Sequence, residues 1–121
     1  IGVPSIAEGT AFYNGVMEAL GYDLIVATDG FAAYGKDTPQ FLLMKPYDGK
    51  SFSAGNGVHI AFAALSEQAV DIFHQQACEQ GGRCEGKPGS RPAYPKVDVY
   101  AAFVRDPFGN KLEAIFNGFA A

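Results

Sequence analysis

A histidine and a glutamate stand within two apolar segments of the chain. His59 lies in "VHIAFAA" (58–64) and Glu113 lies in "KLEAIFN" (111–117). If both segments are strands, His59 shares a face with small alanines, and Glu113 projects from the face opposite Leu112. A carboxylate is costly to bury without a partner. A divalent metal ion shared with the imidazole would compensate it, since nitrogen and carboxylate ligands suit Fe, Mn, Ni or Zn.

Both residues also fit ordinary structural roles. A single histidine in a strand is compatible with a hydrogen-bonded core position, and Glu113 could pair with Lys111 or Arg105 at a sheet edge. Two ligands alone do not make a typical metal site. The pattern therefore leaves two interpretations open, a metal centre and a structural polar pair.

The surrounding elements follow an internal repeat with an offset of 61 positions. The identical pairs are Ser5 with Ser66, Phe12 with Phe73, Glu18 with Glu79, and Gly21 with Gly82. In each copy a capping serine precedes an apolar pattern of helical spacing and a glycine follows it. Ser5 and Glu8 also have the spacing of a capping box. We expect core-facing side chains at Ala11, Phe12, Val16, Ala19 and Leu20 in the first helix and at Ala69, Ile72, Phe73 and Ala77 in the second.

Short extended segments complete each copy. They cover 22–27, 30–35 and 40–46 in the first copy, and 83–85, 97–105 and 111–117 in the second, with a long loop at 86–98 and a hairpin turn at 106–110. Each copy therefore reads β-α-β-β-β, which predicts a single α+β domain over residues 1–121. Module one spans 1–45, a linker spans 46–57, and module two spans 58–117.

The repeat also indicates where a third metal ligand could lie. The counterpart of His59 falls just before Ile1, and because the chain has no initiator methionine we expect further residues there, including a histidine. The counterpart of Glu113 falls on apolar Leu42 or Met44. A fourth protein ligand is therefore not expected.

Composition excludes several classes of function. With 121 residues, 48% of them hydrophobic and 18% charged, the chain fits one globular domain. A formal charge of −4 and the lack of a Lys/Arg cluster argue against nucleic-acid binding. No apolar run approaches membrane-spanning length, and Cys78 and Cys84 lack zinc spacing, so we expect a cytoplasmic protein with reduced thiols. His74, beside two glutamines, is expected at the surface.

The motifs in the second half of the chain resemble those of a known superfamily. "GNGVHIAFAALSEQAVDIFHQQACEQGG", "PGSRPAYP" and "YAAFVRDPFGNKLEAIF" are similar to the vicinal oxygen chelate superfamily, which includes glyoxalases, bleomycin-resistance proteins, fosfomycin-resistance enzymes and extradiol dioxygenases. The resemblance implies two βαβββ modules whose curved mixed sheets surround a cavity, commonly completed in a homodimer. "HIAF" and "FVRDPFGNKLE" are its most specific parts.

The resemblance also implies a ligand set and a chemistry. His59 matches the metal ligand of the first strand in module two, and Glu113 matches that of the last strand. An apolar residue at the fourth position departs from the four-ligand glyoxalase pattern and looks more like the His-His-Glu set of dioxygenases and fosfomycin-resistance enzymes, which puts lactoylglutathione lyase activity in doubt. The implied reaction is chelation of two adjacent substrate oxygens, with the metal as Lewis acid.

Three further residues are candidates for the substrate cavity. Arg91 could bind a substrate carboxylate through its guanidinium fork, and Tyr94 or Tyr100 could donate a proton to an oxyanion. Each also has an ordinary explanation, because Arg91 could only solvate its loop and Tyr100 could simply pack in a sheet.

We therefore expect a metal-dependent lyase, isomerase or dioxygenase acting on a small molecule with vicinal oxygens. Glu113 and Tyr94 are its expected catalytic groups, and Arg91 and Tyr100 are its expected substrate contacts. The alternative is a metal-free protein of the bleomycin-resistance type that binds a ligand in an aromatic cavity.

Overall fold

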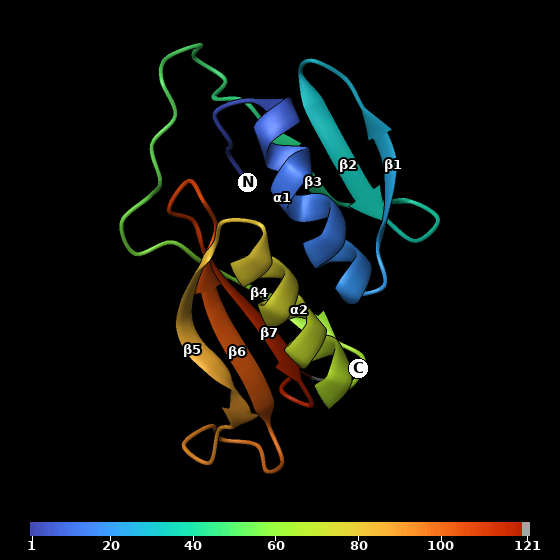
Figure 1. Cartoon of the computed structure of the whole chain (residues 1–121), viewed down its shortest axis with the longest axis vertical. Helices are drawn as coiled ribbons and strands as arrows, with labels where there is room; N and C mark the ends of the chain where they lie inside the picture. Colours follow the sequence, from blue (N-terminus) through green and yellow to red (C-terminus); the bar gives the residue numbers. More distant parts are fainter. Residues whose placement is uncertain (120–121) are drawn as a thin grey trace.

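The computed structural model describes residues 1–119, and this part of the chain forms two helices and seven strands (Figure 1). Their bounds are α1 Ile6–Ala19, β1 Asp23–Ala27, β2 Phe31–Gly35, β3 Pro39–Met44, β4 His59–Ala64, α2 Glu67–Glu79, β5 Arg83–Ser90, β6 Tyr100–Arg105 and β7 Lys111–Phe116. The predicted α+β class and the β-α-β-β-β order are confirmed. The first strand of the first copy is reduced to one parallel bridge between Gly2 and Met44.

The helices begin and end where the capping residues predict. The hydroxyls of Ser5 and Ser66 accept hydrogen bonds from backbone N–H groups three residues later, at 3.1 and 3.0 Å. After the helices, Gly21 and Gly81 have φ values of +85° and +97°. Glycine is favoured there because a side chain would strain that left-handed backbone.

The buried stripe of each helix differs in part from the predicted one. In α1, Tyr13 and Met17 are buried and Ala11 is exposed. Tyr13 can be buried because its hydroxyl finds a carboxylate partner on another element. In α2, Val70 is buried beside Phe73 and Ala77, whereas Ile72 is 39% exposed and lines a groove between the helices. The prediction that Ala11 and Ile72 face the core is therefore wrong, because both side chains lie on the solvent side of their helices.

Two sheets carry the remaining strands, in the orders β1-β2-β3 and β4-β7-β6-β5. In the second sheet β4 pairs in parallel with β7, while all other strand pairs are antiparallel. Figure 1 shows α1 beside the first sheet and α2 beside the second. One shared core lies under both helices, and within it the rings of Phe41 and Phe62 meet edge to face at 5.1 Å.

Strand β5 is longer than predicted, and the loop that follows it is shorter. Gly86, Pro88 and Gly89 indicated a loop from residue 86, yet the strand continues to Ser90. These residues are tolerated because β5 is an edge strand whose register shifts on both sides of Gly86. The next strand begins at Tyr100 instead of residue 97, since Asp98 adopts a positive φ of 61°.

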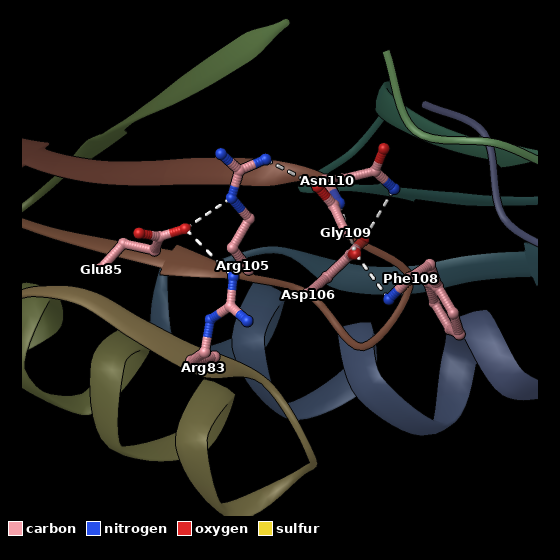
Figure 2. Close-up of polar contacts among 7 residues, drawn as sticks. All are labelled: Arg83, Glu85, Arg105, Asp106, Phe108, Gly109 and Asn110. Atoms are coloured by element: carbon pink, nitrogen blue, oxygen red, sulfur yellow. Dashed lines mark hydrogen bonds and ion pairs between the residues drawn. The ribbon is translucent and has the colours of Figure 1, made fainter. Parts of the chain in front are cut away.

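The turn between β6 and β7 joins the two modules. Asp106 is 3% exposed and its carboxylate accepts hydrogen bonds from the backbone N–H groups of Phe108 and Asn110 and from the Asn110 side chain (Figure 2). It also accepts one from the hydroxyl of Tyr13 on α1, at 2.6 Å. The Asn110 amide donates to the carbonyl of Gly2. One hairpin turn of module two thus holds both the helix and the first residues of module one.

Candidate functional site

The parallel pairing of β4 with β7 brings the histidine and the glutamate together. In the register, Ala61 lies opposite Glu113 and His59 lies opposite Lys111. Phe62 faces the shared core under the helices, so the odd-numbered residues of β4 point away from α2, as the alternation predicts. Glu113 projects from that same face.

The imidazole and the carboxylate are in direct contact. His59 Nε2 lies 2.9 Å from Glu113 Oε1. Glu113 is 5% exposed, whereas the His59 side chain is 35% exposed and forms the open side of the pair. Glu113 therefore does not use either of the partners considered from the sequence, Lys111 or Arg105; Arg105 instead pairs with Glu85 at 2.6 Å.

Tyr94 completes the environment of the carboxylate. Its hydroxyl donates a hydrogen bond of 2.7 Å to Glu113 Oε2, so both carboxylate oxygens have partners. Burial, the hydrogen bond to Glu113 and the charge of Glu113 raise the pKa of Tyr94 to about 12, against an opposing effect of Arg91. The phenol consequently keeps its proton at neutral pH.

Arg91 lies near the same site, over an aromatic ring. Its guanidinium carbon is 5.3 Å from the centre of the Phe103 ring, and Nη2 donates to the carbonyl of Lys87 at 2.6 Å. Its Nε is buried and has no hydrogen-bond partner within residues 1–119. Arg91 and Tyr94 also line a surface hollow with residues 90, 92 and 96–99.

Tyr100 lies on the opposite face of the sheet. It packs against the core under the helices, and its hydroxyl donates to Asp71 of α2 at 2.6 Å. The structure thus brings His59, Glu113 and Tyr94 into contact and places Arg91 nearby, whereas Tyr100 is separated from them by the sheet.

Phe103 and Lys111 belong to the site but were not predicted. Phe103 lies directly opposite Glu113 in the β6–β7 register, and its ring centre is 5.9 Å from that of His59. Lys111 Nζ is 6.0 Å from the centre of the same ring. Alternation along β6 gave only part of the signal, because it puts Phe103 and Ala101 on one face but does not say which strands lie beside β6.

The two donor atoms fit a shared metal ion in type and spacing. Ligands bonded at roughly 2.1 Å to one ion stand roughly 3 Å apart, close to the 2.9 Å between His59 Nε2 and Glu113 Oε1. Across the described chain, no group of three His, Cys, Asp or Glu side chains is placed to hold an ion. His59 and Glu113 alone therefore do not make a complete metal site.

The backbone pairing identifies the module-one counterpart of Glu113. Gly2 forms a backbone bridge with Met44. The repeat offset of 61 makes Ala63 of β4 the counterpart of Gly2, and Ala63 pairs with Ile115. Met44 thus corresponds to Ile115, and Leu42 takes the place of Glu113. An apolar side chain at this position cannot serve as a metal ligand.

Comparisons with known proteins agree with this architecture. The model of the Glyoxalase/Bleomycin resistance protein/Dioxygenase superfamily matches residues 1–114, and the chain belongs to this superfamily. The crystal structure of a glyoxalase/bleomycin resistance protein from Albidiferax ferrireducens T118 is 32% identical, with a TM-score of 0.85, and the match covers 97% of this chain and 93% of that one. No curated protein matched the sequence.

More distant structures share the fold. A lactoylglutathione lyase from Agrobacterium tumefaciens is 19% identical, with a TM-score of 0.64 over 98% of this chain and 90% of that one. A glyoxalase-related enzyme from Fulvimarina pelagi is 16% identical, with a TM-score of 0.71 over 97% and 84%. Separately, no helix in residues 1–119 is long and apolar enough to cross a membrane.

Proposed function

We propose that this protein is a metal-dependent enzyme, of the lyase, isomerase or dioxygenase type, that acts on a small molecule with two adjacent oxygens. The proposal depends on one observation: His59 Nε2 and Glu113 Oε1 lie 2.9 Å apart on the sheet face that α2 leaves uncovered. Membership of the superfamily supports the same reading. Fe, Mn, Ni or Zn would suit this nitrogen and oxygen pair.

Each residue of the site has a distinct proposed role. His59 and Glu113 would hold the ion, which supplies Lewis-acid charge beside the substrate oxygens when bound. Tyr94 orients Glu113 through Oε2 and leaves Oε1 directed at His59. Where a substrate oxygen takes the place of Glu113 Oε2, the Tyr94 hydroxyl would donate its hydrogen bond to that oxygen. Arg91 would bind a carboxylate of the substrate with its guanidinium group.

We further propose that two copies assemble to complete the site. Val26, Leu42 and Met44 are 39%, 37% and 49% exposed and share the face of the first sheet that α1 does not cover. Exposed apolar surface of this kind is typical of protein interfaces. A second copy covering this face would bury it and could bring further donors to His59 and Glu113. We place the enzyme in the cytoplasm, where the exposed, unpaired Cys78 and Cys84 would stay reduced.

A metal-free binding protein is the second candidate. It is favoured by the donor count, because His59 and Glu113 gain no third His, Cys, Asp or Glu partner within residues 1–119. In that case Phe103, Tyr94 and Arg91 would bind a planar ligand, and the His59–Glu113 contact would only organise the site.

Metal analysis of the purified protein separates the two candidates. After incubation with Fe, Mn, Ni or Zn and removal of excess ion, we expect near-stoichiometric metal in the wild type and in His74→Ala. His74 is the chain's other histidine and lies on α2, so this variant is a matched control. His59→Ala and Glu113→Gln are expected to lose the metal. Wild-type protein that retains no ion after repletion would establish the binding-protein reading instead.

A further inference from the structure

A row of basic side chains crosses the second sheet beside the candidate site. The registers place Arg83 opposite Arg105, Arg105 opposite Lys111, and Lys111 opposite His59. Directly paired residues project from the same face, so the row spans all four strands on the side away from α2. The whole chain has a net charge of −4, and the three cations of this row, Arg83, Arg105 and Lys111, therefore run against its overall charge, while His59 adds a neutral imidazole at the fourth strand.

In the outer half of the row, Arg83 and Arg105 share one carboxylate, which compensates part of their charge. Arg105 Nε lies 2.6 Å from Glu85 Oε1, and Arg83 Nη2 lies 3.5 Å from the same oxygen (Figure 2). Arg105 also donates to the carbonyl of Gly109 at 2.9 Å. Both arginines therefore have a carboxylate partner in Glu85, and these contacts orient their guanidinium groups.

The positive charge of Lys111, in the inner half of the row next to His59, has no carboxylate partner in the described part of the chain. Glu113 is occupied by His59 and Tyr94, and within residues 1–119 no carboxylate lies at ion-pair distance from Lys111. Arg91 likewise has no carboxylate partner there, and its buried Nε makes no hydrogen bond in that part of the chain.

The ring of Phe103 holds these two cations next to the metal-ligand candidates. Lys111 Nζ is 6.0 Å and the Arg91 guanidinium is 5.3 Å from the ring centre, and the His59 ring is 5.9 Å away. A cation over an aromatic ring is attracted by the ring face but keeps its charge and its hydrogen-bond donors. The arrangement thus offers uncompensated positive charge around one aromatic surface.

We propose that the substrate is anionic, and that Lys111, with Arg91, binds a carboxylate or phosphate group of a molecule whose adjacent oxygens face His59 and Glu113. This inference rests on the proposed function of the same site and adds the charge of its substrate. Lys111 is a specificity-determining residue in this scheme. It selects charged substrates over neutral ones of the same shape, because the neutral analogue leaves the ammonium unpaired.

A pair of matched probes tests the inference. We would measure binding of 3,4-dihydroxybenzoate and of its neutral methyl ester to the metal-loaded protein by calorimetry. Both probes carry adjacent oxygens, and only the acid carries a charge. We expect the wild type to bind the acid about tenfold more tightly, the size of one charge-assisted hydrogen bond, with a smaller ratio in high salt.

Substitutions then assign the preference to Lys111. Lys111→Gln is expected to reduce the ratio of the two affinities to near one, whereas Lys111→Arg and the control Lys36→Gln, at an exposed site in module one, are expected to keep it. A Lys111→Gln protein that does not fold leaves the wild-type ratio, its salt dependence and Lys111→Arg as the test.

The other outcomes overturn the inference in distinguishable ways. Equal binding of acid and ester to the metal-loaded wild type would refute the anionic substrate and leave the metal-dependent function standing. An equal loss of both affinities in Lys111→Gln would show that Lys111 stabilises the site but does not distinguish charged from neutral ligands. If neither probe binds and the sample has kept its metal, the anionic-substrate inference fails and the metal-dependent function stands; if the sample has lost its metal, the proposed function fails as well.

Discussion

At the scale of single residues, the carboxylate of Glu113 is the centre of the site. It is almost fully buried, and such a group is stable only when its oxygens are compensated. His59 and Tyr94 provide this compensation from two directions. The same two contacts fix the orientation of the carboxylate, so the position of Oε1 is set before any ligand arrives.

Removal of the Tyr94 hydroxyl is expected to weaken the proposed metal binding without unfolding the protein. In Tyr94→Phe the carboxylate loses the donor on Oε2, and loss of such an outer partner typically costs roughly 10-fold to 100-fold in metal affinity. Competition with a chelator of known affinity measures the change. Tyr100→Phe is the control, since its hydroxyl bonds Asp71 on the far side of the sheet. Identical affinities in the two variants would contradict this role.

Titration in alkali is expected to show the raised pKa of Tyr94. The folded protein holds this proton to about pH 12, while the unfolded chain releases it near pH 10, a typical tyrosine value. The folded state then binds more protons, so this stabilisation is present below about pH 10 and is lost as the pH rises toward 12. Burial and hydrogen bonding also raise the pKa values of Tyr13, Tyr34 and Tyr100, so absorbance at 295 nm would show several late-ionising tyrosines, with one fewer in Tyr94→Phe than in the wild type. A spectrum in which the variant loses an early-ionising group would refute the assignment.

Alternation along two apolar strands was enough to predict that His59 and Glu113 share a face. Alternation alone did not predict that the two side chains lie in contact on adjacent strands, because strand order and register are set by packing between distant segments. Phe103 was overlooked for the same reason: its closeness to His59 arises from the order β4-β7-β6. Tyr100 was a candidate because a phenol can donate to an oxyanion, and the sequence did not show that its face of β6 is the one packed under the helices.

At the scale of elements, the β6–β7 turn acts as the joint between the modules. Its carboxylate, on Asp106, accepts hydrogen bonds from its own turn and from α1, and a buried network of this kind is costly to break in part. The sequence predicted the turn from its Pro and Gly residues. It did not reveal the contact with Tyr13, which lies 93 positions away.

Replacement of this carboxylate is expected to destabilise the whole domain. Asp106→Ala leaves the hydroxyl of Tyr13 and the amide of Asn110 without their buried acceptor, and we expect a loss of about 2–4 kcal/mol in the free energy of unfolding. Urea unfolding measures it. Asp29→Ala, in the exposed β1–β2 turn, is expected to change stability by less than about 0.5 kcal/mol. Equal losses of stability from the two substitutions would argue against the role of Asp106 in linking the modules.

At the scale of the whole molecule, the two modules share a core but differ in chemistry. The first sheet presents Leu42 where the second presents Glu113, so one half of the repeat carries apolar surface and the other carries the polar site. The internal offset predicted this asymmetry from the sequence. It could not predict that the apolar face lies uncovered in a single copy, because exposure depends on the packing of complete sheets.

A charge placed on that face is expected to separate the proposed dimer. Wild-type protein is expected to show about twice the chain mass of 12.8 kDa in light scattering, and Met44→Glu to show the single-chain mass, because burial of an unpaired carboxylate opposes association. Tyr47→Glu is the control on a fully exposed linker residue. A wild-type protein that is already monomeric at micromolar concentration would rule out a site completed by two copies of the chain.

The placement of β7 governs the order in which this protein can be built. Within residues 1–119, β7 follows every other strand in sequence, yet it lies between β4 and β6 and is hydrogen-bonded to both. During synthesis, a nascent chain that has not yet released residues 111–116 from the ribosome leaves unpaired backbone on both of these strands. Imidazole and carboxylate thus meet only after β7 has paired, and until then the edges of β4 and β6 are open to pairing with other chains.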